Sequence, residues 1–372
     1  MNKKRIAIIS SGSVGTGFNS EGIPHHAVLI DKLAANYDIT IFSFARVNEN
    51  FTPKKYKVID VSFLANQRLL FRFLYLFFQL SCNHLKNPYQ IFLGFWGFPS
   101  GFLAVLVGKI YRRPSIAAFI GGEVVHLPKI NYGEFHKKWF RKLLRFTASN
   151  TDTLLVLSKY QKKKIKESGL FFKQIQLIPF GVDSRKFKFT NEPLKRPLQL
   201  LHVADINLVK DQETLLRTFK KIRENVDAHL TIIGRDTLEG KMQALAQKLG
   251  LDENISFLGR ISYEKLPAYF AKSHIFLLTS LSESQAVVVN EAMASGLVVA
   301  GTRVGLIADL ENLCTLAVDI KDSDSLAQKV IALINNPQQL EDYKAKGLDW
   351  TIKHDINWTV RSYQEIFESL SK

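Results

Sequence analysis

Short apolar runs alternate with amphipathic segments along almost the whole chain, and this alternation predicts the secondary structure. Runs rich in Ile, Val, Leu and Phe are typical of buried strands, whereas apolar residues that repeat every third or fourth position are typical of helices. In the first half we predict strands at 5–10, 39–44, 58–61, 91–95, 116–120, 153–157 and 175–178. Between them we predict helices at 23–36, 66–85, 101–111, 132–149 and 159–168.

The second half repeats the alternation more regularly. We predict strands at 198–204, 229–234, 255–258, 275–279, 298–301 and 316–318, with helices between them. Further helices are predicted at 326–334, 338–348 and 357–370. Such β–α alternation predicts an α/β fold with doubly wound parallel sheets. A turn at 179–183 and a polar, proline-containing stretch at 184–197 mark the expected linker between two domains, 1–183 and 198–354.

The charge of the chain is concentrated in one half. The chain has 372 residues, which suits two domains, and its formal net charge is +16. Residues 1–190 contain 29 Lys+Arg and 10 Asp+Glu, a balance of +19, whereas the remainder contains 21 and 24, a balance of −3. Such an asymmetry suggests that the first half meets an anionic membrane, nucleic acid or acidic acceptor.

No segment of the sequence indicates secretion or membrane insertion. The N-terminal apolar run is too short for a signal peptide and is predicted to be a strand. The longest uncharged window, 87–108, is interrupted by prolines and glycines, so we do not expect it to span a membrane. Cys82 and Cys314 lie in opposite halves with no metal-ligand spacing, which fits a reducing cytoplasm.

The stretch 274–301 contains the most informative chemistry. It reads as a strand, a polar turn, a helix closed by Gly296, and a second strand. Ligands of parallel sheets bind outside the carboxyl ends of the strands, where a helix N-terminus presents unpaired N–H groups. Glu283 and Glu291 flank the start of this helix. A helix N-terminus suits phosphate, and a carboxylate suits sugar hydroxyls; alternatively, Glu283 is a helix cap and Glu291 a surface residue.

These residues also carry a family resemblance. Glu283 and Glu291 with seven residues between them, followed by Ala-Met-Ala-Ser-Gly at 292–296, resemble the signature of retaining glycosyltransferase family 4, or group 1. The resemblance extends loosely over nearly the whole chain. It implies the GT-B fold, in which two Rossmann-like domains face a central cleft. The first domain would bind the acceptor and the second the nucleotide-sugar, and the segment 355–372 would cross back to the first domain.

The resemblance assigns roles around the predicted helix. Glu291 would bind the ribose hydroxyls of the nucleotide, while Glu283, Ser284 and Gln285 would hold the transferred sugar. The helix N-terminus at Ser284–Ala286 would meet the charge of the leaving group. Gln285 and Ala286 stand where the family often has Phe-Gly, which leaves the donor sugar open.

Two further strand ends resemble donor-binding segments of the family. Lys210 would neutralise the diphosphate, an interaction typically worth ~3–4 kcal/mol in the transition state. The family's usual phosphate-binding arginine, about five residues earlier, is missing, because Ala204 and Asp205 stand there. Arg235 and Arg260 are the candidate substitutes. Ile261, beside Arg260, would contact the nucleobase; a simple turn is the alternative for this last pair.

The first half contains two candidate loops. Residues 11–17 form a glycine loop that matches neither the dinucleotide pattern nor a P-loop and is equally compatible with a tight turn. By resemblance, Gly15, Thr16 and Gly17 would lie near the donor phosphate. His126 follows a predicted strand and two glycines, and it resembles the histidine that contacts the donor sugar; a structural histidine is the alternative.

A basic helix is the expected contact with an anionic partner. Five cationic residues share one face of the predicted helix 132–149: Lys137, Lys138, Arg141, Lys142 and Arg145. Contact with anionic lipid and a solvated face are both open, while nucleic acid is not expected because no recognition motif accompanies the charge. The D-x-D at 322–324 directly precedes a predicted helix, so we interpret it as a cap and not as a metal site.

Together these observations predict an enzyme that moves a sugar, with retention, from a nucleotide-sugar to a lipid-linked or surface-polysaccharide acceptor. The resemblance implies no metal and no cofactor besides the nucleotide-sugar co-substrate. We expect a cytoplasmic protein that contacts the inner face of the membrane peripherally. The alternative is a non-catalytic subunit of GT-B fold that binds a partner or a membrane, which the missing arginine supports.

Overall fold

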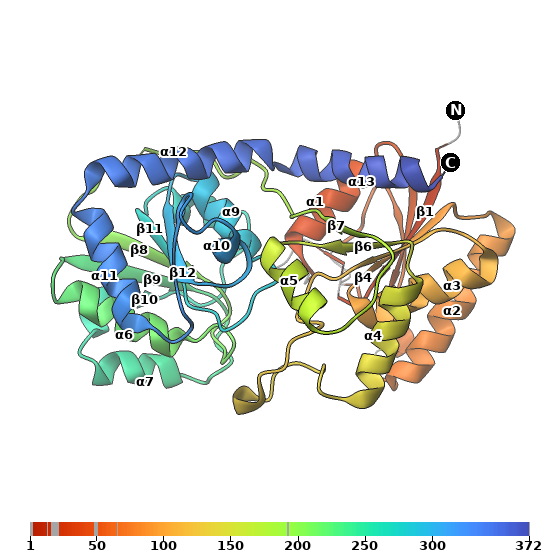
Figure 1. Cartoon of the computed structure of the whole chain (residues 1–372), viewed down its shortest axis with the longest axis horizontal. Coiled ribbons are helices and arrows are strands. Elements are labelled where there is room, and N and C mark those ends of the chain that lie inside the picture. The colour runs from red at the N-terminus through yellow and green to blue at the C-terminus, as the bar shows by residue number, and fades with distance from the viewer. Residues whose placement is uncertain are drawn as a thin grey trace. The chain divides into compact units, whose positions relative to one another are not determined.

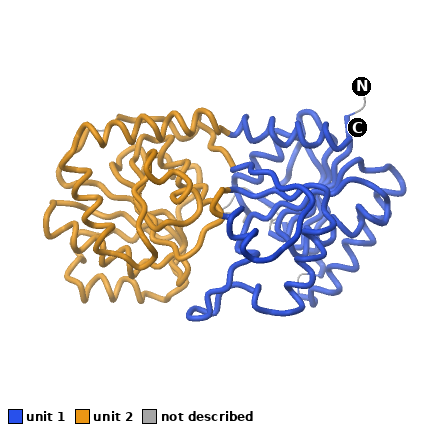
Figure 2. The backbone as a smooth tube through the Cα atoms, viewed as in Figure 1, with its two compact units in different colours: residues 1–157, 161–179, 356–372 blue, residues 158–160, 180–355 orange. Residues whose placement is uncertain are grey.

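The structure is a computed structural model that describes residues 3–12, 14–15, 22–47, 51–64, 66–191 and 193–371. The chain divides into two compact units (Figure 2). The first unit contains residues 1–157, 161–179 and 356–372, and the second contains residues 158–160 and 180–355. Each unit is described by itself.

The first unit is built on a parallel sheet of seven strands in the order β3-β2-β1-β4-β5-β6-β7 (Figure 1). The strands are β1 Arg5–Ser10, β2 Asp38–Ser43, β3 Lys57–Ile59, β4 Ile91–Phe95, β5 Ser115–Ala118, β6 Thr153–Val156 and β7 Ile175–Leu177. β4, β5 and β6 are buried along their whole length, as expected of parallel strands covered on both faces.

Helices cover both faces of this sheet. They are α1 Pro24–Leu33, α2 Leu69–Lys86, α3 Phe102–Tyr111, α4 Lys138–Asn150, α5 Lys159–Glu167 and α13 Ile356–Leu370. Right-handed crossovers place α2, α3 and α4 on one face, where α3 packs between the other two. The predicted helix 132–149 begins only at Lys138, because Gly133 has a left-handed backbone (φ +91°) that interrupts a helix there.

The final helix packs in the first unit, against α1. The rings of Tyr37 and Phe367 meet edge to face at 5.2 Å, and the Tyr37 hydroxyl donates a hydrogen bond to Glu368 Oε1 at 3.2 Å. Thr359 Oγ1 donates to the carbonyl oxygen of Pro179 at 2.9 Å. The last apolar helical face of the sequence therefore completes the core that the first strands begin.

The second unit contains a parallel sheet of six strands in the order β10-β9-β8-β11-β12-β13. The strands are β8 Leu198–Val203, β9 Ala228–Ile233, β10 Ile255–Phe257, β11 Ile275–Leu278, β12 Val298–Thr302 and β13 Thr315–Val318. The helices are α6 Gln212–Arg223, α7 Lys241–Lys248, α8 Leu266–Phe270, α9 Val287–Ala294, α10 Gly305–Asp309, α11 Ser323–Ile334 and α12 Pro337–Lys353. Phe187, from the stretch expected to be a linker, is fully buried in this unit against Phe270.

The strand order of each sheet reverses at one point. The reversal lies between β1 and β4 in the first unit and between β8 and β11 in the second. Loops that leave neighbouring strands in opposite directions open a crevice there, and ligands of such folds bind in it. The carboxyl ends of β8 and β9 come very close, since a Cβ added at Gly234 would lie 1.9 Å from the carbonyl oxygen of Ala204. The topology therefore selects the loops after β8 and β11 as the first place to look for a site.

Candidate functional site

The loops after β8 and β11 are joined side by side at the reversal point of the second sheet. Leu281 N donates to the carbonyl oxygen of Val209 at 2.7 Å. The Thr279 hydroxyl lies 3.1 Å from the carbonyl oxygen of Lys210 and 2.9 Å from that of Asp211. Thr279 is fully buried, so these contacts fix the relative position of the two loops.

Lys210 and Glu283 form an ion pair across this junction. Lys210 Nζ lies 2.5 Å from Glu283 Oε1, although the residues are 73 positions apart in the sequence. Ser280 Oγ donates to the same carboxylate oxygen at 2.7 Å. The side chains are 25% and 12% exposed, so the pair is sheltered but reachable from solvent. In this position the Lys210 ammonium can form an ion pair with an incoming diphosphate, and the Glu283 carboxylate can accept a hydrogen bond from a sugar hydroxyl.

The Gln285 side chain ties the turn from β11 into α9 to the backbone of Phe180. Its amide donates to the carbonyl oxygen of Phe180 at 2.8 Å, and its Oε1 accepts from Phe180 N at 2.8 Å. The side chain is 1% exposed, so Gln285 shapes the turn with both ends of its amide already used. Ala286 then adopts a left-handed backbone (φ 65°) directly before the first residue of α9. Of the predicted donor residues in this turn, Gln285 is thus placed as a structural support, and Ser284 lies beside it.

Glu291 lies inside α9 and is 3% exposed. The Tyr263 hydroxyl donates to its Oε1 at 2.8 Å, and the Lys186 ammonium stacks on the Tyr263 ring 3.9 Å from its centroid. Burial raises the pKa of Glu291 to about 7, although the hydrogen bond from Tyr263 and the charge of Lys186 oppose the shift. Glu291 is therefore a carboxyl group whose charge changes near neutral pH.

His202 supports the same junction from within the sheet. Its Nδ1 lies 2.8 Å from the carbonyl oxygen of Leu277, and its Nε2 lies 3.2 Å from the amide nitrogen of Gln212. Burial lowers the pKa of His202 to about 4, so the ring is neutral at pH 7. A neutral ring with a proton on Nδ1 satisfies both contacts and ties β8 to β11. Sequence reasoning did not assign this role.

Asp205 stands where the family's arginine is expected, and it pairs with Arg235. Arg235 Nη2 lies 3.0 Å from Asp205 Oδ2, and Arg235 N donates to Asp205 Oδ1 at 3.0 Å. Arg260 and Ile261 follow β10, where Gly259 has a left-handed backbone (φ +64°). Arg260 is exposed, and Ile261 packs partly against the core of the unit.

In the first unit, the residue that organises the corresponding edge is Glu123. Its carboxylate accepts hydrogen bonds from Gly121 N at 3.0 Å, Ile120 N at 3.1 Å and Gly97 N at 3.4 Å. Burial raises the pKa of Glu123 to about 7, and these backbone contacts oppose the shift. Glu123 thereby holds together the loops after β4 and β5. A glutamate directly after paired glycines at a strand end was the available sequence signal.

His126 lies three residues further, in the same loop. It is exposed, and its ring lies 4.4 Å from the ring of His136. Gly15 is buried, while Thr16 and Gly17 lie outside the described residues. On α4, Lys138, Lys142 and Arg145 are exposed, Arg141 is half-buried, and Lys137, just before the helix, pairs with Glu134 at 2.5 Å.

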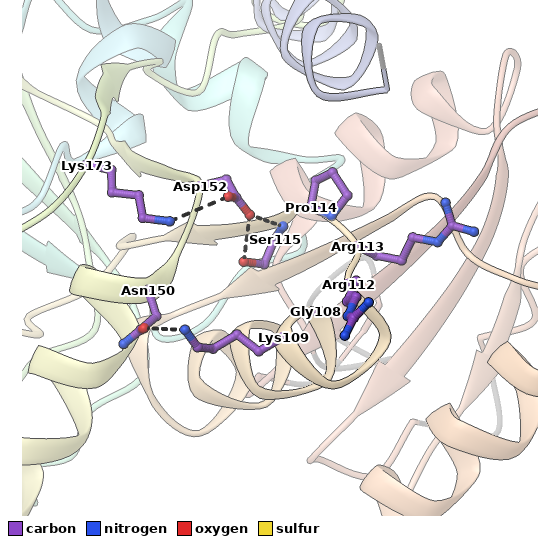
Figure 3. Close-up of a pocket in the computed structure, with 9 residues that line it drawn as sticks. All are labelled: Gly108, Lys109, Arg112, Arg113, Pro114, Ser115, Asn150, Asp152 and Lys173. Atoms are coloured by element: carbon purple, nitrogen blue, oxygen red, sulfur yellow. Dashed lines mark hydrogen bonds and ion pairs between the residues drawn. The ribbon is translucent and has the colours of Figure 1, made fainter.

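A basic pocket lies at the opposite edge of the first sheet (Figure 3). Its volume is about 340 Å³, and it is lined by Gly108, Lys109, Arg112, Arg113, Pro114, Ser115, Asn150, Asp152 and Lys173. Asp152 Oδ2 accepts from Ser115 N at 2.8 Å, and Lys109 Nζ donates to Asn150 Oδ1 at 2.6 Å. Because these residues lie at or before the amino ends of β5, β6 and β7, the pocket is separate from the carboxyl edge, where ligands of this fold bind.

The described part of the chain shows no three His, Cys, Asp or Glu side chains gathered as metal ligands would be. Asp322 Oδ1 accepts a hydrogen bond from Ser325 N at 2.9 Å and caps α11, as the cap interpretation of the D-x-D requires. Nor does any helix among the described residues combine the length and hydropathy of a membrane span.

Comparison with solved structures identifies the architecture. Sucrose-phosphate synthase of Thermosynechococcus elongatus superposes with a TM-score of 0.79 at 17% identity and covers 99% of both chains. The HepE protein of Anabaena, solved in complex with UDP, gives a TM-score of 0.78 at 14% identity and covers 98% of this chain and 100% of its own. At such identities these matches show the fold alone, and that fold is GT-B, as predicted.

Sequence comparison gives the family. The family model described as "Glycosyl transferases group 1" matches residues 183–350, most of the second unit, in agreement with the resemblance found in the sequence. A GDP-mannose-dependent monoacylated alpha-(1-6)-phosphatidylinositol monomannoside mannosyltransferase of Corynebacterium glutamicum is 27% identical over 217 residues. That alignment covers 53% of this chain and 56% of the relative. The matched stretch spans 48% and 56% of the length of two curated relatives and 74% of a third.

Proposed function

We propose that this protein is a retaining glycosyltransferase that moves a hexosyl or N-acetylhexosaminyl group from a nucleotide-diphosphate sugar to an acceptor. The observation that carries the proposal is the Lys210–Glu283 pair at the reversal point of the second sheet, directly before α9. This arrangement offers a cation and helix N–H groups for a diphosphate, and a carboxylate for a sugar. The match of residues 183–350 to the group 1 glycosyltransferase family model supports the same chemistry.

In the proposed reaction, the bond between the anomeric carbon and the diphosphate oxygen breaks while an acceptor hydroxyl oxygen bonds to the same face of that carbon. The nucleoside diphosphate departs with the electron pair of the broken bond, and its departing oxygen accepts the proton of the acceptor hydroxyl. Lys210 and the N–H groups at the start of α9 meet the charge that develops on the leaving group. Glu283 and Ser284 orient the sugar, and Glu291 accepts hydrogen bonds from the ribose hydroxyls. Contact of His126 with the sugar and of Ile261 with the base stay predictions.

We propose further that the acceptor is lipid-linked or a surface glycan, that no metal takes part, and that the protein works in the cytoplasm at the membrane. The name of the Corynebacterium relative, which specifies a phosphatidylinositol mannoside, supports a lipid acceptor. The basic balance of residues 1–190 supports an anionic partner for the first unit.

A second candidate is a non-catalytic subunit of the same fold. Asp205, which stands where the family's phosphate-binding arginine is expected, favours it. Because its carboxylate pairs with Arg235, the charge of Asp205 offsets that of one of the two candidate substitute arginines.

A binding screen separates the two candidates. Purified protein is tested for thermal stabilisation by UDP-, GDP- and ADP-sugars, and the screen is repeated with Lys210→Ala and Glu291→Ala. The transferase proposal expects one nucleotide-sugar to stabilise the wild type and neither variant. If no nucleotide-sugar stabilises the wild type, the proposal fails and the non-catalytic candidate leads.

A further inference from the structure

Helix α2 of the first unit presents an exposed apolar stripe. The largest exposed side chains on it are Leu70 (63%), Phe71 (52%), Leu74 (54%), Phe78 (62%) and Leu85 (71%). With about 100° of rotation per residue, these five positions fall within an arc of about 100°. Leu76 and Leu80 point elsewhere and are fully buried in the core of the unit. An apolar stripe of this kind, interrupted at the buried Ser81, marks a surface that meets something other than water.

The layer to which α2 belongs contains no acidic residue. Neither α2, α3 nor α4 includes an Asp or Glu, whereas they contain two, one and four Lys or Arg residues respectively. In the sequence, the acid-free stretch runs from 61 to 122 and contains six Lys or Arg. The outer surface of this layer is therefore cationic without neutralising partners on the same helices.

The apolar stripe and the basic face belong to one continuous layer (Figure 1). Phe102 of α3 contacts Phe73 of α2 at 5.9 Å and Phe146 of α4 at 5.1 Å, measured between ring centroids. α4 buries Leu144 toward the sheet and exposes Lys142 and Arg145. Trp139, at the first turn of α4, is 52% exposed. The outer surface of the layer is thus apolar along α2 and cationic along α4.

We propose that this layer docks on an anionic phospholipid bilayer, with the apolar stripe of α2 entering the boundary between headgroups and acyl chains and the α4 cations contacting lipid phosphates. Basic and aromatic residues beside an apolar helical face are the composition that binds such an interface. A second copy of the chain is disfavoured as the occupant, because two acid-free cationic layers repel each other. Sequence analysis selected α4 alone; the insertion element is α2.

The test uses the full-length protein and vesicles, without nucleotide-sugar. Wild type is expected to co-sediment with vesicles of equal parts phosphatidylcholine and phosphatidylglycerol, to bind pure phosphatidylcholine much more weakly, and to dissociate as salt is added. Phe78→Gln should lower the partition coefficient about fivefold, and Leu74→Gln/Phe78→Gln about tenfold or more. Ile352→Gln on α12 is the matched control, since Ile352 is 61% exposed and lies in the second unit, and it should bind as wild type does.

The charge arm uses a control of equal charge change. Lys142→Glu/Arg145→Glu should lower binding about tenfold, whereas Lys220→Glu/Lys248→Glu, at exposed positions of the second unit, should lower it much less. Equal losses in the two charge variants, or wild-type binding by the α2 variants, would overturn the proposal. So would a dimer that the α2 double variant converts to a monomer. Nucleotide-sugar binding is measured in parallel and should be unchanged in the α2 variants, so failure of this surface is distinguishable from failure of the proposed function.

Discussion

Among the described residues, each unit buries a glutamate near the carboxyl edge of its sheet, and the two are held in different ways. Glu123 in the first unit is surrounded by backbone N–H groups of two loops. Glu291 in the second unit has a side-chain partner, Tyr263, with Lys186 nearby. Backbone donors cannot turn away without unfolding the loops, whereas a tyrosine hydroxyl can yield to a ligand hydroxyl. Although both glutamates are buried, Glu123 therefore stabilises two loops of the first unit, whereas Glu291 is a candidate binding group in the second.

The surfaces of the units differ in the same sense. The residues of the first unit contain 27 Lys+Arg and 11 Asp+Glu, a balance of +16, whereas those of the second contain 23 of each, a balance of 0. In the second unit, the candidate site is the Lys210–Glu283 ion pair at the reversal of the strand order. In the first unit, cationic side chains lie on the layer of α2, α3 and α4 and in the basic pocket. Under the two proposals made above, the same topology serves small-molecule chemistry in the second unit and contact with an extended anionic partner in the first.

The largest effect should come from breaking the ion pair of the second unit. With the nucleotide-sugar that the screen identifies, Lys210→Ala should lower turnover about 10²–10³-fold, because a cation aimed at the leaving group is lost from a sheltered site. Steady-state kinetics measure it. Lys220→Ala, an exposed lysine on α6, is the control and should stay within about twofold. A Lys210→Ala enzyme less than about tenfold slower would mean that the ion pair is structural.

The next effect sharpens the role of Glu123. Its pKa is about 7 in the folded protein against 4.5 for an ordinary glutamate, so the folded state holds the proton over the window between these values. The contribution of Glu123 to the free energy of unfolding is therefore fully present below pH 4.5 and is lost as pH rises through about 7. Between pH 5 and 8 this loss amounts to about 2 kcal/mol. In Glu123→Gln this part of the pH dependence should vanish.

Calorimetric melting between pH 5 and 8 tests this expectation, with Glu134→Gln as the control. Glu134 is exposed and lies in the same connection between β5 and α4, so its variant should keep the wild-type pH dependence. A Glu123→Gln protein that parallels the wild type at every pH would show that Glu123 is already ionised in the folded state.

A smaller effect is expected for Glu291, in binding. If its carboxylate accepts hydrogen bonds from ribose hydroxyls, donor affinity should rise up to about tenfold from pH 6 to 8, as a group with a pKa of about 7 loses its proton. Calorimetric titration measures the slope, which Glu291→Gln should abolish. Tyr263→Phe removes a hydrogen bond that lowers the pKa of Glu291. The rise in donor affinity should therefore occur at a higher pH in this variant than in the wild type. An affinity independent of pH in the wild type would exclude the carboxylate from the site.

Much of this comparison was predictable from the sequence, because the fold depends on local pattern. The strands predicted at 275–279 and 298–301 are found at Ile275–Leu278 and Val298–Thr302, and the parallel α/β architecture follows from the β–α alternation. The resemblance selected Lys210 and Glu283 separately. Their ion pair was not predictable, since it joins residues 73 positions apart through loop geometry that no local pattern specifies.

The features that the sequence concealed are those where many positions look alike. α2 has apolar residues on nearly every side, so periodicity could not tell Leu76, which is buried, from Phe78, which is exposed. At 121–126 a histidine drew attention as a reactive side chain, although Glu123 makes the contacts that define the loop. The side-chain amide of Gln285 binds Phe180, more than a hundred residues away, which no local pattern predicts; contact of Gln285 with the donor stays a prediction.

The smallest predicted effect concerns the missing arginine. Arg235 and Asp205 form an exposed ion pair, 62% and 41% accessible, of a kind that contributes at most about 1 kcal/mol. Because Asp205 offsets the charge of Arg235, Arg235→Ala should change donor affinity by less than about twofold, whereas Asp205→Ala should raise it about two- to threefold by freeing the guanidinium. Arg260→Ala removes a cation beside the predicted base contact, so it should lower donor affinity more than Arg235→Ala does. Calorimetric titration of all three variants with the donor decides between the two arginines. A tenfold loss of donor affinity in Arg235→Ala would make Arg235 the substitute cation although it is paired with Asp205. The role of Asp205 would then be to position the Arg235 guanidinium.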